Sequence, residues 1–237
     1  MTFAAAALAI SQTTVVMIHG AGGGGWEYDL WKPVFEKAGY KVIARDLIPA
    51  KGGLAHTNVT HYLDQVVSWC PKTGRVVIVG ASMGGILALM AAQEVFPARV
   101  VLVNSVPSDE IAQLPMSEPA PDVVQWANGP LKDTEVSMPD SDRKTILWAW
   151  KKWRNESGTV MNQIRTGIIV NRPNCPSLVV IGGNDTDISP EISFKSAGMY
   201  SSQVLYYPKM SHVGPLLSTK AKSVAADVIE WLKTPRK

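Results

Sequence analysis

Cysteine is scarce in this chain, because its 237 residues include only Cys70 and Cys175. Two cysteines are too few for a disulfide framework or for a zinc site made of cysteines. Each leads into a predicted strand, and a third strand is expected between these two. With strands about 4.8 Å apart, the two cysteines should lie roughly 9–10 Å from each other. A disulfide needs Cα atoms within about 7 Å, so we expect two unpaired thiols.

Long apolar runs and clusters of one charge are also missing. No run approaches the roughly 20 apolar residues that span a bilayer, so we predict no membrane span. The formal net charge is only +3, from 23 basic and 20 acidic residues. The densest basic cluster, Lys151 to Arg154, is typical of the solvated face of a helix. We therefore expect no nucleic-acid partner.

The first ten residues are rich in alanine, and Ala7-Leu8-Ala9 resembles a signal-peptidase site. No basic segment precedes this site and the apolar stretch is short, which favours an ordinary extension and a cytoplasmic protein. A trimmed signal peptide is the alternative, and it would indicate a secreted or periplasmic protein.

The chain does contain a regular alternation of β-rich and helical stretches. This alternation predicts an α/β fold with a mostly parallel central sheet of about six strands, covered by helices on both faces. The predicted strands are Thr14–Ile18, Lys41–Asp46, Arg75–Val79, Val100–Asn104, Ser177–Ile181 and Val204–Tyr207. The predicted helices are Trp26–Ala38, Asn58–Trp69, Met83–Val95, Glu191–Met199 and Thr219–Lys233.

One region interrupts the alternation. Between about residues 107 and 172 no clear strand is predicted, five prolines punctuate the chain, and a helical stretch follows near Arg143–Arg154. We interpret this region as a lid inserted into a single domain that spans residues 1–237. We expect a monomer or a homodimer.

The strongest motif is Gly80-Ala81-Ser82-Met83-Gly84, a G-x-S-x-G sequence. A predicted strand precedes it and a predicted helix follows, which is the context that exposes a nucleophilic serine. Glycines two residues either side of Ser82 keep the tight turn free of Cβ clashes. The helix N-terminus favours negative charge at the site. A simple glycine-rich turn is the alternative.

A nucleophilic serine needs a base, and His212 is the best placed of four histidines. It follows the last predicted strand, in a loop that should open on the same sheet edge as Ser82. His56 and His61 are expected at the surface, and His19 lies within a glycine turn.

The base in turn needs an acid that holds its tautomer and supports the imidazolium. Asp185 follows the predicted strand Ser177–Ile181 through a Gly-Gly-Asn turn and is the first choice. Asp187 and Asp109 remain alternatives.

The oxyanion of such a reaction needs two N–H donors. One should be Met83, the residue after the nucleophile, and the other Ala21, with Gly22 second. The alternative is a phosphate-binding loop, because Gly20–Gly25 loosely contains G-x-G-x-x-G and Asp46 follows at nearly the required spacing. That alternative leaves the serine, aspartate and histidine above unexplained.

Together these residues resemble the α/β-hydrolase superfamily over nearly the whole chain. The His-Gly-Ala start and the spacing to Gly80–Gly84 look like small-lid serine esterases, a group similar to plant methyl-ester esterases, hydroxynitrile lyases and bacterial carboxylesterases. The resemblance implies an α/β-hydrolase fold with a helical lid. It also implies a Ser82–His212–Asp185 triad with the Ala21 and Met83 amides as the oxyanion hole. Ala81 departs from the family, where His is common.

The function implied is a carboxylesterase that hydrolyses small to medium apolar esters through an acyl-enzyme, without metal or cofactor. A hydroxynitrile lyase is one alternative, although lyases of this kind carry Thr and Lys where this chain has Gly20 and Val213. A non-enzymatic small-ligand receptor is the other. The partner expected is a small-molecule ester.

The predicted lid is rich in Trp and Met, which suit an adaptable apolar pocket. We expect Gly22, Trp126, Trp148 and Met138 to contact the substrate. The other residues of this kind are Met116, Trp150, Trp153 and Met161.

Overall fold

The computed structural model describes residues 13–109, 111 and 118–235. Six strands form one sheet in the order β2-β1-β3-β4-β7-β8, and every neighbouring pair is parallel. The strands are β1 (Thr13–Ile18), β2 (Lys41–Ala44), β3 (Arg75–Ala81), β4 (Arg99–Val103), β7 (Ser177–Gly182) and β8 (Gln203–Tyr207). The predicted α/β class and six-stranded sheet are confirmed.

The central strands bury both faces, as their continuous apolar runs predict. In β1, Val16 and Ile18 pack into one core layer, whereas Val15 and Met17 pack into the other. Successive side chains of a strand point to opposite faces, so each apolar run supplies both layers.

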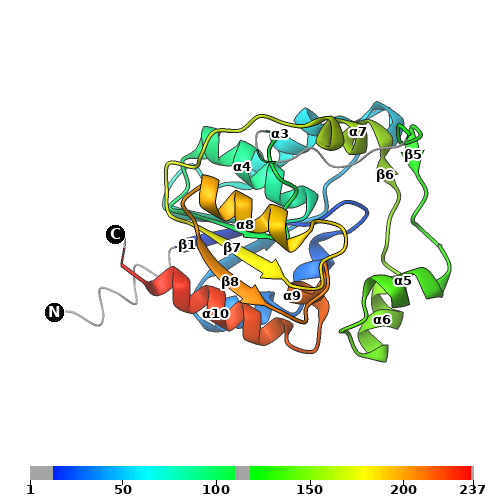
Figure 1. Ribbon diagram of the computed structural model, residues 1–237. Coiled ribbons are helices and arrows are strands. Elements are labelled where there is room, and N and C mark those ends of the chain that lie inside the picture. The colour runs from blue at the N-terminus through cyan, green and yellow to red at the C-terminus, as the bar shows by residue number, and fades with distance from the viewer. Residues whose placement is uncertain (1–12, 110, 112–117, 236–237) are drawn as a thin grey trace.

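Helices cover the two faces as separate layers (Figure 1). One layer contains α3 (Val59–Trp69), α4 (Met83–Val95), α7 (Gly158–Thr166) and α8 (Pro190–Met199). The other contains η1 (Gly25–Tyr28), α2 (Lys32–Lys37), α9 (Gly214–Leu217) and α10 (Ala221–Lys233). The single helix predicted over Trp26–Ala38 is thus two shorter elements, and Pro33 lies in the first turn of the second.

The segment between β4 and β7, residues 104–176, is called the insertion below. It contains β5 (Val123–Val124), α5 (Leu131–Ser137), α6 (Arg143–Trp150), β6 (Glu156–Ser157) and α7. Strands β5 and β6 pair antiparallel. The expectation of no strand here is therefore wrong for these two elements, because a two-residue ladder is too short to show a sequence pattern.

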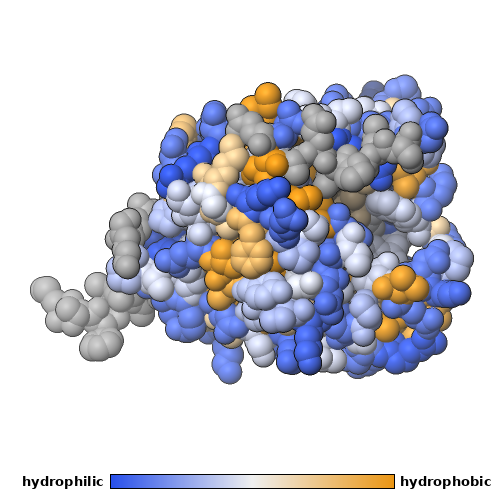
Figure 2. All heavy atoms as spheres, viewed as in Figure 1, coloured by the Kyte–Doolittle hydropathy of each residue, from blue (hydrophilic) through white to orange (hydrophobic). Residues whose placement is uncertain are grey.

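Within the insertion, α5 and α6 form a pair at one side of the molecule, and α7 lies beside α3 (Figure 1). In the space-filling view the surface is hollowed between the α5–α6 pair and the main body (Figure 2). Apolar side chains of α8 and β8, including Phe194, Met199 and Val204, reach the surface.

Cys70 and Cys175 are not joined by a disulfide, as predicted. Across the described ranges 13–109 and 118–235, no helix is both long and apolar enough to cross a membrane. The alanine-rich start and Met116 lie outside the described residues.

Candidate active site

Ser82 occupies a strained turn between β3 and α4. Its φ of 50° and ψ of −122° lie outside the regions that a residue with a side chain prefers. A Cβ at Gly80 would collide with the Gly84 carbonyl, and one at Gly84 would collide with the Ile18 carbonyl. The Ser82 N–H donates to the Val103 carbonyl at 3.0 Å, which ties the turn to β4. The local structure therefore holds the strain and projects the serine beyond the sheet.

His212 and Asp185 meet at the carboxyl edge of the same sheet. His212 Nδ1 lies 2.9 Å from each carboxylate oxygen of Asp185. Asp185 Oδ1 also accepts hydrogen bonds from the N–H groups of Asp187 and Ile188, both at 2.9 Å. Burial would lower the pKa of His212, but its hydrogen bond to Asp185 and the nearby negative charges raise it overall.

Neither alternative acid forms a hydrogen bond with Nδ1 of His212. Asp187 Oδ2 is 3.8 Å from His212 Nε2, and this side chain is 67% exposed. Asp109 lies in the insertion, where its carboxylate packs against Gly167. Of the three candidate acids, the structure brings Asp185 into hydrogen-bond contact with Nδ1.

Two residues that sequence reasoning missed fix the histidine loop. The Asn104 amide, at the end of β4, donates to the carbonyls of His212 at 2.7 Å and Ser211 at 3.2 Å. Its oxygen accepts from Gly182 N–H at 2.7 Å. Asp140, in the insertion, accepts from both Ser211 N–H and Ser211 Oγ, at 3.0 and 2.7 Å. The loop is therefore held from the sheet and from the insertion.

The glycine loop after β1 runs against Ser82, since a Cβ at Gly20 would lie 3.2 Å from that of the serine. Gly20 N–H donates to Glu27 and Gly22 N–H donates to Glu156, both at 3.0 Å. No described residue accepts a hydrogen bond from the Ala21 N–H between them. Gly22 was the second choice, after Ala21, for the oxyanion donor from this loop. Its N–H already binds Glu156, so it is not free to bind an oxyanion.

The insertion anchors this glycine loop. Glu156 is 3% exposed and also accepts from the Tyr62 hydroxyl at 2.7 Å. Arg154 donates from its backbone N–H to the Gly22 carbonyl at 2.7 Å and from Nε to the Gly23 carbonyl at 2.6 Å. The expectation that Arg154 belongs to a solvated helix face is wrong, because it follows the end of α6 and binds the loop.

His19 is a structural residue at the start of the glycine loop. Its Nδ1 lies 2.7 Å from the Gly20 carbonyl, and its Nε2 accepts from Leu47 N–H at 2.9 Å. Burial lowers the pKa of His19 to about 4. A neutral ring with its proton on Nδ1 satisfies both contacts.

The family model for the alpha/beta hydrolase family matches residues 15–227. The chain belongs to this family. Solved structures agree in fold: a pyrethroid hydrolase from Sphingobium faniae superposes with a TM-score of 0.76 at 21% identity, over 94% of this chain and 98% of that one.

Curated relatives of this α/β hydrolase come from plants. Norfluorocurarine synthase 1 of Strychnos is 31% identical over 156 residues, 59% of the chain. Methylesterase 3 of Arabidopsis thaliana is 34% identical over 96 residues, 36% of the chain, and an alpha-hydroxynitrile lyase of that plant is 34% identical over 94 residues, also 36%. The matches span 57%, 35% and 35% of these relatives' own lengths. The predicted resemblance to the methylesterase and hydroxynitrile lyase group is confirmed.

Ser82 and His212 of the α/β hydrolase share a cavity of about 600 Å³, between the sheet edge and the insertion. Ala21 and Met83 line it, as does the predicted substrate contact Trp126. The remaining aromatic and sulfur-containing residues of the wall are Trp150, Trp153 and Met161.

Three other predicted substrate contacts do not line this cavity. Met138 is fully buried in the core. Trp148 packs edge-on against Trp26, with ring centroids 5.2 Å apart. Gly22 packs under the Trp126 ring. Residue type alone could not distinguish the pocket face of the insertion from the face that packs on the core.

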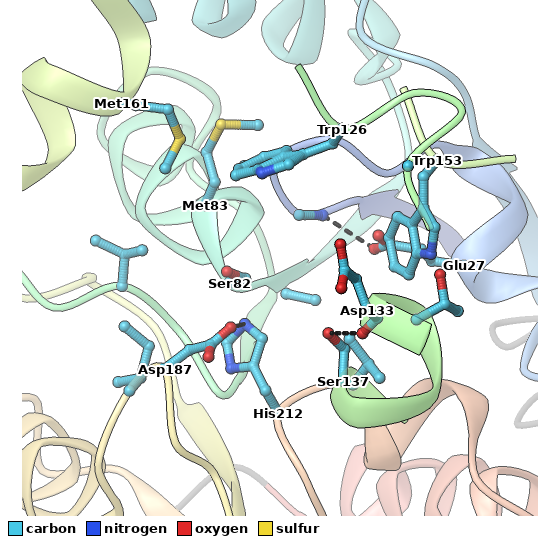
Figure 3. A pocket seen from close by; sticks show the side chains of 18 of the residues that line it. Glu27, Ser82, Met83, Trp126, Asp133, Ser137, Trp153, Met161, Asp187 and His212 are labelled. Carbon is cyan, nitrogen blue, oxygen red and sulfur yellow. Dashed lines mark hydrogen bonds and ion pairs between the residues drawn. The ribbon is translucent and has the colours of Figure 1, made fainter. Parts of the chain in front are cut away.

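Glu27 is the site residue most clearly missed from the sequence. It comes from η1, is 4% exposed and lines the cavity beside Ser82 and His212 (Figure 3). Burial raises the pKa of its carboxyl from 4.5 to about 7, although the Gly20 N–H and His212 oppose the change. Nothing in the local sequence marks it, because a single Glu near a helix start is typical of a surface residue.

Proposed function

We propose that this α/β hydrolase is a serine carboxylesterase that forms an acyl-enzyme on Ser82. The observation that carries the proposal is the His212–Asp185 hydrogen-bonded pair on the cavity that also holds Ser82. A strained serine at a strand–turn–helix junction, beside a histidine held by a buried carboxylate, is the arrangement that activates a hydroxyl nucleophile. The similarity to Methylesterase 3 named above supports an ester substrate.

In the proposed reaction His212 Nε2 takes the proton of Ser82 Oγ as this oxygen attacks the ester carbonyl. Asp185 holds the proton on Nδ1 and supports the imidazolium. The N–H groups of Ala21 and Met83 stabilise the oxyanion. The histidine then gives its proton to the departing alcohol. Water attacks the acyl-enzyme by the same route and releases the acid.

The cavity supports small to medium substrates with apolar parts. Trp126, Trp150 and Met161 supply apolar walls, and the flexible Met161 side chain can adapt to different substrates. At about 600 Å³ the space falls within the usual range of small-molecule sites. A lyase that releases cyanide would need a cation beside His212, and the next residue, Val213, supplies none.

The test is covalent labelling with diethyl p-nitrophenyl phosphate, read by mass spectrometry, beside hydrolysis of p-nitrophenyl esters of increasing acyl length. We expect the phosphoryl label on Ser82, and expect Ser82→Ala to lose both labelling and hydrolysis while folding normally. Ser137→Ala alters another serine on the cavity wall and should still be labelled. Full hydrolysis by folded Ser82→Ala would overturn the proposal.

A further inference from the structure

Glu27 presents to the proposed active site a carboxylate oxygen that has no hydrogen-bond partner among the described residues. Its Oε2 accepts the Gly20 N–H, but no described residue donates a hydrogen bond to Oε1 or forms an ion pair with the carboxylate. The guanidinium of Arg154 is bonded to the carbonyls of Gly23 and Leu47 and lies 3.4 Å from Asp46. A carboxylate this buried normally has a partner, so the missing partner points to a ligand.

The space for this carboxylate is built into the glycine loop. A Cβ at Gly23 would collide with Glu27 Oε1. A Cβ at Gly20 would lie 3.8 Å from the same oxygen and 3.2 Å from the Ser82 Cβ. The carboxylate therefore flanks the serine across a loop that carries no side chain between them.

A second carboxylate and three indole rings line the same cavity. Asp133, from α5, points into the cavity between Trp126 and Trp153, on the side of Glu27 (Figure 3). Trp153 is packed edge-on against Trp26, with centroids 4.9 Å apart. Trp150 is held by a 2.7 Å hydrogen bond from Nε1 to the Gly129 carbonyl. Trp150 and Trp153 are therefore anchored parts of the wall.

The charges of the cavity are divided between its walls. Glu27 and Asp133 come from η1 and α5, whereas Arg165 comes from α7 together with Met161 and Ile164. A further carboxylate, that of Asp187, lines the cavity beside His212, 3.8 Å from its Nε2 (Figure 3). In Figure 3, Met161 lies away from the Glu27 side, near Met83. The Glu27 side is thus acidic and aromatic.

We propose that this wall, Glu27 and Asp133 with Trp126, Trp150 and Trp153, binds a cationic ammonium group, so that the enzyme prefers esters carrying a quaternary or tertiary ammonium. The inference rests on the proposed esterase reaction and names its substrate class. A cation supplies the charge that the buried Glu27 carboxylate lacks, and indole rings attract ammonium groups by cation–π interaction. An uncharged isostere gains the same packing but leaves the carboxylate unpaired.

The first experiment compares two esters of the same shape, butyrylcholine and 3,3-dimethylbutyl butyrate, which differ by a quaternary nitrogen in place of a carbon. At pH 8 we expect kcat/KM to favour the choline ester by about tenfold or more, since both the cation–π contact and the paired carboxylate stabilise the cation and not the neutral isostere. Glu27→Gln should lower this ratio at least tenfold.

The matched control is Glu36→Gln, which neutralises an exposed glutamate on α2 and should leave the ratio unchanged. Glu27→Asp keeps the charge, and it should retain part of the preference if the variant folds. A wild-type enzyme that hydrolyses both esters equally, or prefers the neutral one, overturns the inference. So does a Glu27→Gln variant with an unchanged ratio, which would indicate a protonated Glu27 that only donates a hydrogen bond.

The second experiment does not depend on turnover. Tetramethylammonium binding to the Ser82→Ala variant is measured by calorimetry, with tryptophan fluorescence as a second signal. We expect saturable binding that weakens at least tenfold on adding Glu27→Gln. Binding without hydrolysis of any ester supports the cation site and rejects the esterase proposal, whereas hydrolysis without binding or ester preference rejects only the cation site.

Discussion

Both carboxylate oxygens of Asp185 lie 2.9 Å from Nδ1 of His212. The Asp185 carboxylate is also fully buried and fixed by two backbone N–H groups, so it cannot turn away from the ring. Asp187 approaches the other ring nitrogen at 3.8 Å and is largely exposed. Of these two acids, only Asp185 therefore has a part in the proposed reaction, although a single residue separates them.

Asp185→Asn should lower kcat/KM for a p-nitrophenyl ester by about 10³–10⁴, because an amide can impose the wrong tautomer on the histidine. Asp187→Asn and Asp109→Asn should lower it less than tenfold. Steady-state kinetics of the three variants, each checked for folding by circular dichroism, makes the comparison. If Asp109→Asn were instead the variant with the large loss of kcat/KM, the acid would come from the insertion.

Asp140→Ala should lower kcat by roughly 10–100-fold with a smaller change in KM, because a misplaced base slows the chemistry more than binding. The variant loses both hydrogen bonds from Ser211, next to His212. Asp140→Asn, which keeps one acceptor, should recover part of the rate.

Asp142→Ala is the matched control for that variant. It removes the cap of α6, where Asp142 accepts from Thr145 N–H at 2.7 Å, and should cost about 1 kcal/mol of stability with kcat preserved. Equal losses of kcat in Asp140→Ala and Asp142→Ala would show that the insertion affects the site only through its overall stability.

Glu27→Gln should change the pH dependence of stability. The pKa of Glu27 is about 7 when folded and near 4.5 when unfolded. Below pH 4.5 the contribution of Glu27 to the free energy of unfolding is therefore fully present. It is lost as the pH rises to about 7. Gln does not titrate, so urea unfolding should show the variant gaining up to about 3 kcal/mol relative to wild type between pH 4 and pH 8.

The exposed Glu36→Gln should show no such gain between pH 4 and pH 8. If the free energies of unfolding of wild type and Glu27→Gln changed in parallel with pH, Glu27 would have an ordinary pKa. That result would also count against an unpaired Glu27 carboxylate at pH 8.

Treatment with EDTA followed by gel filtration should leave ester hydrolysis unchanged, because the proposed reaction uses only Ser82, His212, Asp185 and backbone N–H groups. Hydrolysis of p-nitrophenyl butyrate before and after treatment is the measurement. A loss of activity that added Zn²⁺ or Mg²⁺ restores would contradict this mechanism.

The sheet and the serine turn follow from local sequence. Continuous Val, Ile and Leu runs predict strands buried on both faces, and the alternation with helices predicts their parallel order. The serine turn is also local, since Gly80, Ser82 and Gly84 lie within five residues, next to the strand and helix that strain them. His212 and Asp185 could be placed because parallel strands bring their carboxyl ends to one edge.

Boundaries and the insertion were predicted less well. Helix signals around Trp26–Ala38 continue across a break that Pro33 and tertiary packing produce. The tryptophans and methionines of the insertion look alike in sequence, yet Trp126 lines the cavity whereas Trp148 and Met138 pack inside. Whether such a residue lines the cavity or packs on the core depends on which neighbour buries it. The composition of the segment does not reveal that neighbour.

The sequence by itself therefore determined the strand pattern and the serine turn, because these depend on side chains near one another along the chain. The parallel order of the strands then indicated where an aspartate and a histidine would meet the serine. Only the tertiary structure decided that Glu156 binds Gly22, 134 residues away, and that Asn104 binds the His212 loop. It alone placed the Glu27 carboxylate beside Ser82. Burial and hydrogen bonding between distant segments exist only once the chain has folded, and they control the charge and shape of the cavity.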